Sequence, residues 1–344
     1  MNNRILYITP GFPSDESDTS CIPALQEFFE ELKTRNIDPL VVALHYPASK
    51  NYSWKGIPVH ALGLNNPHPV KQLWQQTKIS KQIQQLAIKH KAELVHSFWI
   101  GDAAWYGQNM AKALQIPHVI TAMGRDFESK SYYKRVIKQN PKIVALSAFH
   151  ELKLKENGLQ PNQVIPHGLS PRKSTPIKKS IDLLFVGSLI ELKHPFDFIE
   201  CCKQLKVNGF EFQAKMIGSG PLEKKILERI NSYGLENNIQ LTGQLSREAT
   251  FEIMDQSKVL YHPSRYESFG MVILEAIRSR MHVVSSPVGI SPEIEGVHLV
   301  ENSDNAAKII QALLDSPAPE SQLPFAIENT VDQYLAIYQS LLKA

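Results

Sequence analysis

Glu267 and Glu275 stand eight positions apart where a predicted strand gives way to a predicted helix. The residues from Lys258 to Tyr261 have the apolar composition of a strand, and the helix is expected to begin near Ser268. The first N–H groups of a helix lack partners within the helix and carry partial positive charge, so this junction favours an anionic ligand. Ser268 suits the N-cap position, and Gly270 has no side chain to keep a phosphate away from the backbone.

The surroundings of Glu275 are apolar, since it lies within the run from Met271 to Ile277. An ionised carboxylate in such a run needs a polar partner or an open cleft. Ribose hydroxyls would be suitable partners. Two plainer interpretations stay open: Glu267 complements the helix dipole, and Glu275 pairs with Arg278 three residues on.

The stretch from Pro263 to Ala276 resembles the signature of retaining GT-B glycosyltransferases of family 4, which reads P-S, then E-x-F-G, then E-A. The resemblance implies transfer of a sugar from a nucleotide diphosphate sugar to a glycan or lipid-linked acceptor, with retention of the anomeric configuration. It also implies that Glu275 holds the ribose and that Glu267 binds a donor-sugar hydroxyl. The implied donor-binding residues in this loop are Arg265, Glu267, Ser268, Phe269, Gly270 and Glu275.

A second stretch, from Val186 to Lys193, follows another predicted strand and resembles the G-R-L, spacer, K element of the same family. In that element the glycine approaches the diphosphate, and the cations neutralise the leaving group as it gains charge. Gly187 and Lys193 match, and the resemblance makes Lys193 a catalytic residue beside Glu267. Ser188 stands where arginine is usual, a loss that Arg265 or Arg125 could offset. Without that match, Lys193 would be read as a solvated lysine.

Two further glycine turns resemble family elements close to the nucleobase. Gly218 lies in the turn from Ile217 to Glu223, and Gly243 ends the strand that begins at Ile239. The first of these turns has an equally good explanation as a tight structural turn that needs no ligand.

On the acceptor side, the resemblance concerns the first half of the chain. Many family members have H-G-x-D where this chain has Met123-Gly-Arg-Asp, and a thioether cannot exchange protons. His96 could compensate, although a buried and satisfied histidine is the alternative interpretation. The residues assigned to the acceptor side are Gly11, His96, Met123, Arg125, Asp126 and His167.

The length of 344 residues suits two domains, and the order of the predicted elements gives an α/β fold class. Short apolar runs alternate with helical patterns in both halves, as in doubly wound parallel sheets. The first turn lacks G-x-G-x-x-G, so NAD binding there is rejected. The resemblance implies a GT-B fold, in which two Rossmann-like domains face a cleft. The expected domains are 1–170 for the acceptor, with the terminal helix 326–344, and 181–325 for the nucleotide sugar, joined by the linker 171–180.

No cofactor or metal is expected, because the chain shows no H-E-x-x-H, clustered Asp pair or D-x-D element. Cys21, Cys201 and Cys202 lack disulfide or C-x-x-C spacing, so they are expected to be buried thiols. Without a signal peptide or apolar run of membrane length, the expected location is cytoplasmic. Nucleic acid is not an expected partner.

The basic stretch 129–142 contains five cations and no acid. It could be a solvated helix face, or it could contact an anionic membrane at its inner face. Two rival functions also stay open: a non-catalytic nucleotide-sugar-binding subunit, suggested by Ser188 and Met123, and a nucleotide-sugar 2-epimerase of the same architecture.

Overall fold

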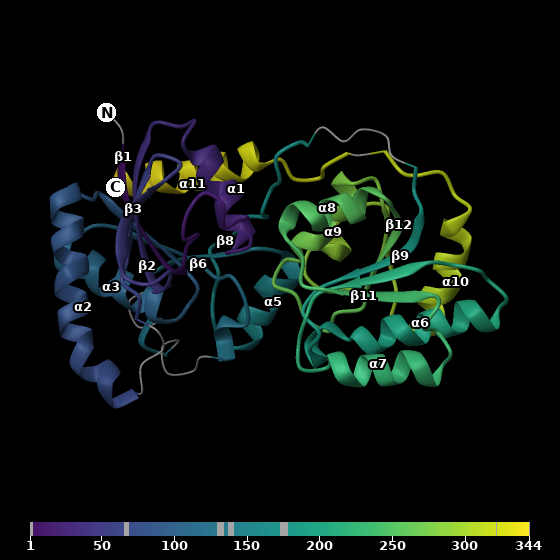
Figure 1. Ribbon diagram of the computed structural model, residues 1–344. Coiled ribbons are helices and arrows are strands. Elements are labelled where there is room, and N and C mark those ends of the chain that lie inside the picture. The colour runs from purple at the N-terminus through teal and green to yellow at the C-terminus, as the bar shows by residue number, and fades with distance from the viewer. Residues whose placement is uncertain are drawn as a thin grey trace. The chain divides into compact units, whose positions relative to one another are not determined.

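The computed structural model describes residues 3–64, 69–128, 134–136, 141–172, 178–320 and 322–343. The chain divides into two compact units (Figure 1). Unit 1 contains Met1–Gly168 and Ile327–Ala344, and unit 2 contains Leu169–Ala326. The first segment of unit 1 ends at Gly168, where 170 was expected, and unit 2 begins at Leu169, where 181 was expected after a linker. Part of the expected linker, 173–177, lies outside the described residues.

Unit 1 is built on an eight-stranded sheet with the order β3-β4-β2-β1-β5-β6-β7-β8. Neighbouring strands pair in parallel, except β3 and β4, which form an antiparallel hairpin at the edge. The sequence analysis missed β3, whose residues are mostly polar and exposed. The strands are β1 (Asn3–Gly11), β2 (Ile37–Tyr46), β3 (Lys50–Trp54), β4 (Ile57–Ala61), β5 (Leu94–Phe98), β6 (His118–Thr121), β7 (Lys142–Ala145) and β8 (Gln163–Val164).

Both faces of the central strands of this sheet are buried, which explains why these strands read as continuous apolar runs. In β1, Tyr7 packs with Phe28 and Phe29 on one face, whereas Leu6 and Ile8 join a separate core cluster on the other. The helices of unit 1 are α1 (Pro23–Leu32), α2 (Pro69–His90), α3 (Asp102–Leu114), α5 (Ala148–Glu156) and α11 (Ile327–Leu342).

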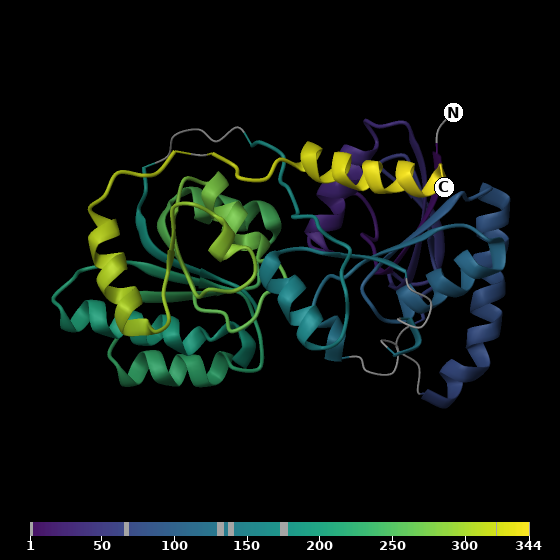
Figure 2. The same cartoon turned by 180° about the vertical axis from the view of Figure 1, so that it is seen from behind.

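The terminal helix α11 returns to unit 1, as the resemblance implied (Figure 2). It packs against α1, and its buried tyrosines enter the same core cluster as Phe28. The Tyr338 hydroxyl lies 2.6 Å from Nδ1 of His96, and the Tyr334 hydroxyl lies 2.9 Å from the Thr121 hydroxyl. The end of the chain therefore completes the core of its first half.

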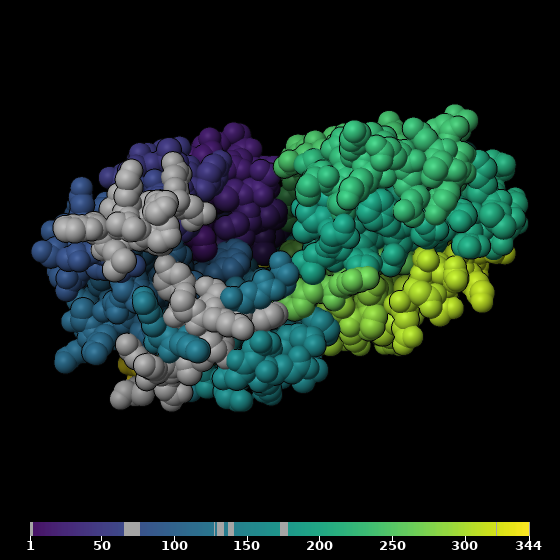
Figure 3. Space-filling view, turned by 90° about the horizontal axis from the view of Figure 1, so that it is seen from below, coloured from purple at the N-terminus to yellow at the C-terminus, as the bar shows by residue number. Residues whose placement is uncertain are grey.

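Unit 2 contains a six-stranded parallel sheet with the order β11-β10-β9-β12-β13-β14. Helices α6 (Pro195–Val207), α7 (Glu223–Ser232) and α10 (Ser303–Leu314) lie side by side over one face (Figure 1). Figure 3 shows the outer surface of unit 2 in teal, green and yellow. The chain runs outward from β9 through β10 to β11, then crosses to β12 on the other side of β9. The strands are β9 (Ile181–Val186), β10 (Ala214–Ile217), β11 (Ile239–Gly243), β12 (Ser257–His262), β13 (His282–Ser285) and β14 (Val297–Leu299).

The carboxyl ends of β9 and β12 therefore form the topological switch point of this sheet, where open α/β sheets bind ligands. The helices of unit 2 are α6 (Pro195–Val207), α7 (Glu223–Ser232), α8 (Arg247–Asp255), α9 (Met271–Arg278) and α10 (Ser303–Leu314). Among the described residues of both units, no helix is long and apolar enough to cross a membrane.

Candidate functional site

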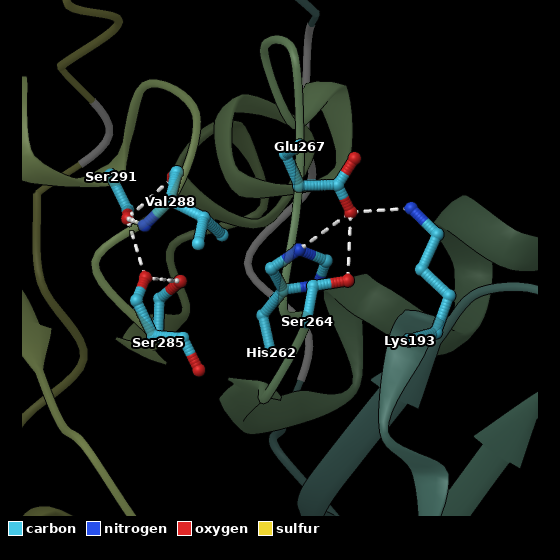
Figure 4. Close-up of polar contacts among 8 residues, drawn as sticks. Lys193, His262, Ser264, Glu267, Ser285, Val288 and Ser291 are labelled. Atoms are coloured by element: carbon cyan, nitrogen blue, oxygen red, sulfur yellow. Dashed lines mark hydrogen bonds and ion pairs between the residues drawn. The ribbon is translucent and has the colours of Figure 1, made fainter. Parts of the chain in front are cut away.

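Glu267 and Lys193 meet at the switch point of unit 2. Glu267 lies in the loop after β12, and Lys193 ends the short 3-10 helix Glu191–Lys193 that follows β9. The Lys193 ammonium forms an ion pair with Oε1 of Glu267 (Figure 4). The two loops are also joined through their backbones, because the Arg265 N–H donates to the Leu192 carbonyl at 2.9 Å. The two residues assigned catalytic roles are thus in direct contact.

Two more groups approach the same oxygen of Glu267. The Ser264 hydroxyl donates to Oε1 at 3.0 Å, and Nε2 of His262 lies 3.0 Å from it. The imidazole nitrogen is thus close enough to stabilise the negative charge on this oxygen. In Figure 4 the other oxygen, Oε2, points away from Lys193, His262 and Ser264.

The electrostatics of Glu267 follow from these neighbours. Burial alone would raise the pKa of its carboxyl, but the contacts with His262 and Lys193 outweigh burial and lower the pKa to about 2. The Glu267 side chain is only 13% exposed. It is therefore a largely buried anion, held ionised by its partners.

The start of α9 corrects one expectation. The helix begins at Met271 with Gly270 as its N-cap, so Ser268 is not the cap residue. Gly270 adopts a φ of 96°, a left-handed conformation that residues with side chains rarely adopt. The Phe269 side chain is buried against Phe325, so its contribution to this region is packing. The loop thus extends two residues beyond the predicted boundary before the helix starts.

The loop after β13 supports the Glu267 loop from the side. Gly289 has a φ of 58°, and a Cβ at this position would lie 2.2 Å from the Phe269 carbonyl oxygen and 2.8 Å from Cβ of Glu267. The Ile290 N–H donates to the Phe269 carbonyl at 2.7 Å. Ser291 closes the loop by donating to the Ser286 carbonyl at 2.7 Å (Figure 4). A side chain at position 289 would therefore collide with the Glu267 loop.

Three predicted donor-side glycines lie side by side at the carboxyl ends of neighbouring strands. The Gly187 N–H donates to the Ile217 carbonyl at 3.0 Å, and the Gly218 N–H donates to the Gly243 carbonyl at 2.9 Å. A Cβ on Gly218 would lie 2.0 Å from the Gly187 carbonyl oxygen. Gly218 thus has a strong structural reason to be glycine. Ser188, which follows Gly187, is exposed.

Glu275 faces a different partner from the one considered in the sequence analysis. Its carboxylate lies 3.5 Å from the Arg247 guanidinium, and both side chains are mostly buried. Arg247 begins α8, whose N-cap Ser246 accepts a hydrogen bond from the Ala249 N–H. The Arg278 guanidinium instead donates to the Ser170 carbonyl at 3.2 Å.

Two family models match adjoining parts of the chain. "Glycosyltransferase Family 4" matches residues 24–173, and "Glycosyl transferases group 1" matches residues 169–326. Together they account for most of both units. The chain belongs to family 4 of the glycosyltransferases and has the GT-B fold.

One relative in sequence matches most of this glycosyltransferase, and solved structures share its fold along nearly the whole chain. An uncharacterized glycosyltransferase of Methanocaldococcus jannaschii is 27% identical over 266 residues, which are 73% of this chain and 71% of the relative. Sucrose-phosphate synthase from Thermosynechococcus elongatus shares the fold with a TM-score of 0.79, 18% identity and 99% coverage of both chains. Anabaena HepE, solved in complex with UDP and glucose, has a TM-score of 0.76 and 18% identity, with 98% of this chain and 100% of HepE covered.

In unit 1 of the glycosyltransferase, His96 has the structural role that was the alternative interpretation. It is fully buried, with Nδ1 near Tyr338 and Nε2 2.8 Å from the Thr121 hydroxyl. Burial lowers its pKa well below the usual range, so the ring is neutral. His167 is also buried, and its pKa is lowered to about 4 by burial and by the neighbouring His150.

The Met123 loop is held together by Asp126. Its buried carboxylate accepts hydrogen bonds from the N–H groups of Ile100, at 3.1 Å, and Met123, at 2.9 Å. Burial nevertheless raises the pKa of Asp126 to about 6. Arg125 is exposed, and its guanidinium pairs with the Glu128 carboxylate at 3.0 Å.

Gly11 ends β1, where a Cβ would have ordinary contacts no closer than 3.6 Å. Most of the basic stretch 129–142 lies outside the described residues. Within the described part of the chain, no group of three or more His, Cys, Asp or Glu residues could hold a metal ion.

Sequence reasoning missed three residues of this site: His262, Ser264 and Arg247. His262 and Ser264 flank Pro263 at the end of β12, and their closeness to Glu267 in sequence was an available signal. Arg247 gave no local signal, because its contact with Glu275 joins two different helices.

Proposed function

We propose that this glycosyltransferase binds a nucleotide diphosphate sugar at the switch point of unit 2 and transfers the sugar to an acceptor hydroxyl. The observation that carries the proposal is the contact between Lys193 and Glu267 at the carboxyl ends of β9 and β12. A cation and a buried anion there match the two charged parts of the reaction, the diphosphate and the developing positive charge on the sugar.

In the proposed reaction, the bond between the anomeric carbon and the diphosphate breaks as the acceptor oxygen bonds to that carbon. The acceptor's proton leaves with the nucleotide diphosphate. Lys193 stabilises the negative charge that grows on the diphosphate, and Oε2 of Glu267 accepts a hydrogen bond from a sugar hydroxyl. The Glu275 carboxylate accepts hydrogen bonds from the ribose hydroxyls. It must therefore contact Arg247 and the ribose together, or lose its contact with Arg247.

Three finer features belong to the proposal. The anomeric configuration is retained, as the resemblance to the family implies. Catalysis needs no metal, because Lys193 supplies the positive charge at the leaving group. The acceptor is a glycan or a lipid-linked glycan bound by unit 1, with peripheral contact to an anionic membrane through 129–142.

A panel of sugar nucleotides tests the proposed activity. The protein is incubated with UDP-glucose, UDP-N-acetylglucosamine, GDP-mannose and ADP-glucose, with glycan acceptors and with EDTA. UDP-glucose is a useful first donor, since the related HepE was solved with UDP and glucose. Transfer with release of nucleotide diphosphate supports the proposal. Binding without turnover would favour a non-catalytic subunit, and an epimerised donor would favour an epimerase.

The proposed membrane contact has a separate test. The protein is sedimented with vesicles that contain anionic lipid across a salt series, beside neutral vesicles. The charge in 129–142 predicts binding to anionic vesicles that weakens as salt rises. No binding at low salt would leave a soluble acceptor as the better account.

A further inference from the structure

Glu267 presents an electrostatic problem for the proposed reaction. Its carboxylate is paired with Lys193, yet the proposed reaction requires Lys193 at the leaving diphosphate. A buried charge that loses its oppositely charged partner is destabilised, and it tends to take up a proton or to move. Either response would prevent the Glu267 carboxylate from accepting a hydrogen bond from the donor sugar.

His262 is placed to solve this problem. It is the last residue of β12, 3% exposed, and its Nε2 lies 3.0 Å from Oε1 of Glu267. Its backbone is fixed by the central position of β12 in the sheet, and its carbonyl accepts the Ser286 N–H at 3.1 Å. His262 therefore remains beside Glu267 when the Lys193 side chain changes its position.

The geometry also separates the two oxygens of the carboxylate. Lys193, His262 and Ser264 all approach Oε1, and in Figure 4 Oε2 is directed away from all three. A carboxylate held through one oxygen has a fixed orientation and keeps the lone pairs of the other oxygen for a ligand.

We propose that His262 is a positioning residue: it holds Glu267 ionised and oriented through Oε1 when Lys193 turns to the donor diphosphate. This inference rests on the proposed function, and it adds a residue to which no role had been assigned. Ser264 assists as a neutral donor. His262 touches neither donor nor acceptor in this account, so it acts through Glu267 alone.

The first test compares two substitutions with a matched control. His262→Leu removes the nitrogen, whereas His262→Gln places an amide N–H at nearly the position of Nε2. His282→Leu is the control, because His282 lies at the amino end of the adjacent strand β13, and its Nε2 lies 3.0 Å from the Pro317 carbonyl. Circular dichroism confirms that each variant is folded.

With the donor that gives most turnover in the panel, His262→Leu should lower kcat roughly tenfold to a hundredfold, the effect of losing one contact with a charged group. The KM for that donor should change little, since the ribose and diphosphate contacts remain. His262→Gln should recover most of the loss, and His282→Leu should behave as wild type. Wild-type kcat in His262→Leu, or equal losses in the Leu and Gln variants, would overturn the inference.

The second test needs no donor. Urea unfolding is measured for Lys193→Met, His262→Leu and the double variant, in the natural protein and in a Glu267→Gln background. Each single change leaves Glu267 one strong partner, so the double variant should lose more stability than the two single losses together. In the Glu267→Gln background the losses should be additive. Additive losses in both backgrounds would show that His262 does not act through Glu267.

The two tests distinguish a failure of this inference from a failure of the proposed function. If Lys193 and Glu267 variants turn over donor like wild type, the proposed function is wrong. If those variants lose turnover while His262→Leu does not, the inference alone is wrong.

Discussion

Lys193 and Glu267 form an ion pair although they lie 74 residues apart in the sequence. The sheet order brings them together, because β12 pairs with β9 and both loops leave the same edge. The pair thus marks the switch point with opposite charges.

Lys193→Ala should lower turnover by about a hundredfold or more, the scale of losing one preorganised charge stabiliser. Lys203→Ala is a suitable control, since Lys203 lies on α6 and pairs only loosely with Glu200, at 3.9 Å. Steady-state kinetics of both variants check the prediction. Equal rates in the two variants would remove Lys193 from the reaction.

Glu275→Ala and Glu267→Ala should affect different kinetic constants. A ribose contact stabilises the bound donor and the transition state equally, so its loss in Glu275→Ala should raise the KM for the donor. Loss of a contact that strengthens in the transition state should make Glu267→Ala lower kcat. Calorimetric titration with UDP separates the two effects, since UDP carries ribose but no sugar. Wild-type kinetics in both variants would contradict the assignment.

The stability of the protein should depend on Glu267 in acid. Its pKa is lowered to about 2 in the folded state, against 4.5 as the ordinary value. Because the folded pKa is depressed, its contribution is present above about pH 4.5 and is lost as the pH falls towards 2. Wild type should therefore lose more stability than Glu267→Gln across this window in urea unfolding. Parallel pH profiles for the two proteins would count against the ionised state of Glu267.

Gly218→Ala should destabilise unit 2 by roughly 3 kcal/mol or more, through backbone strain and overlap. Gly218 has a φ of 136°, and a Cβ would lie 2.0 Å from the Gly187 carbonyl oxygen. Gly101→Ala is the control, because a Cβ there meets nothing within 4 Å. Thermal unfolding of both variants gives the comparison. A stable Gly218→Ala protein would mean that this turn differs from the one described.

Tyr338→Phe should destabilise unit 1 by about 1–3 kcal/mol, because it removes a buried hydrogen-bond partner. Nδ1 of His96 would lose its hydrogen-bond partner, the Tyr338 hydroxyl, which lies 2.6 Å away. Gln339→Ala on the exposed side of α11 should have little effect on unfolding. Similar midpoints for Tyr338→Phe and wild type would show that the hydroxyl does not anchor the helix.

Local patterns predicted the two parallel sheets, because the central strands, such as β1, β5, β9 and β12, are largely buried and therefore mostly apolar. They also predicted the turns at Gly187, Gly218 and Gly243, where strand ends are marked by glycine. They failed at Ser268, because a left-handed Gly270 delays the start of α9 and no propensity encodes that delay. They failed at β3, whose polar residues need only pair with β4.

The partners of the site residues were harder to predict than the residues themselves. Glu275 has a neighbour of the right charge at Arg278, yet the structure pairs it with Arg247 from another helix. The role of His96 could not be decided from the sequence, because the partners of its two ring nitrogens lie far along the chain. One of them, Tyr338, is 242 residues away. Such pairs depend on tertiary packing, which spacing along the chain does not contain.

The central claim is that the donor diphosphate binds where β9 and β12 end, beside Lys193 and Glu267. A crystal structure of the protein with the nucleotide diphosphate of the active donor tests it most directly. The account predicts density for the diphosphate within hydrogen-bond distance of Lys193 Nζ, with Glu267 still held by His262. Density for the nucleotide at any other edge of the sheet, with Lys193 and Glu267 still paired and untouched by ligand, would contradict the account.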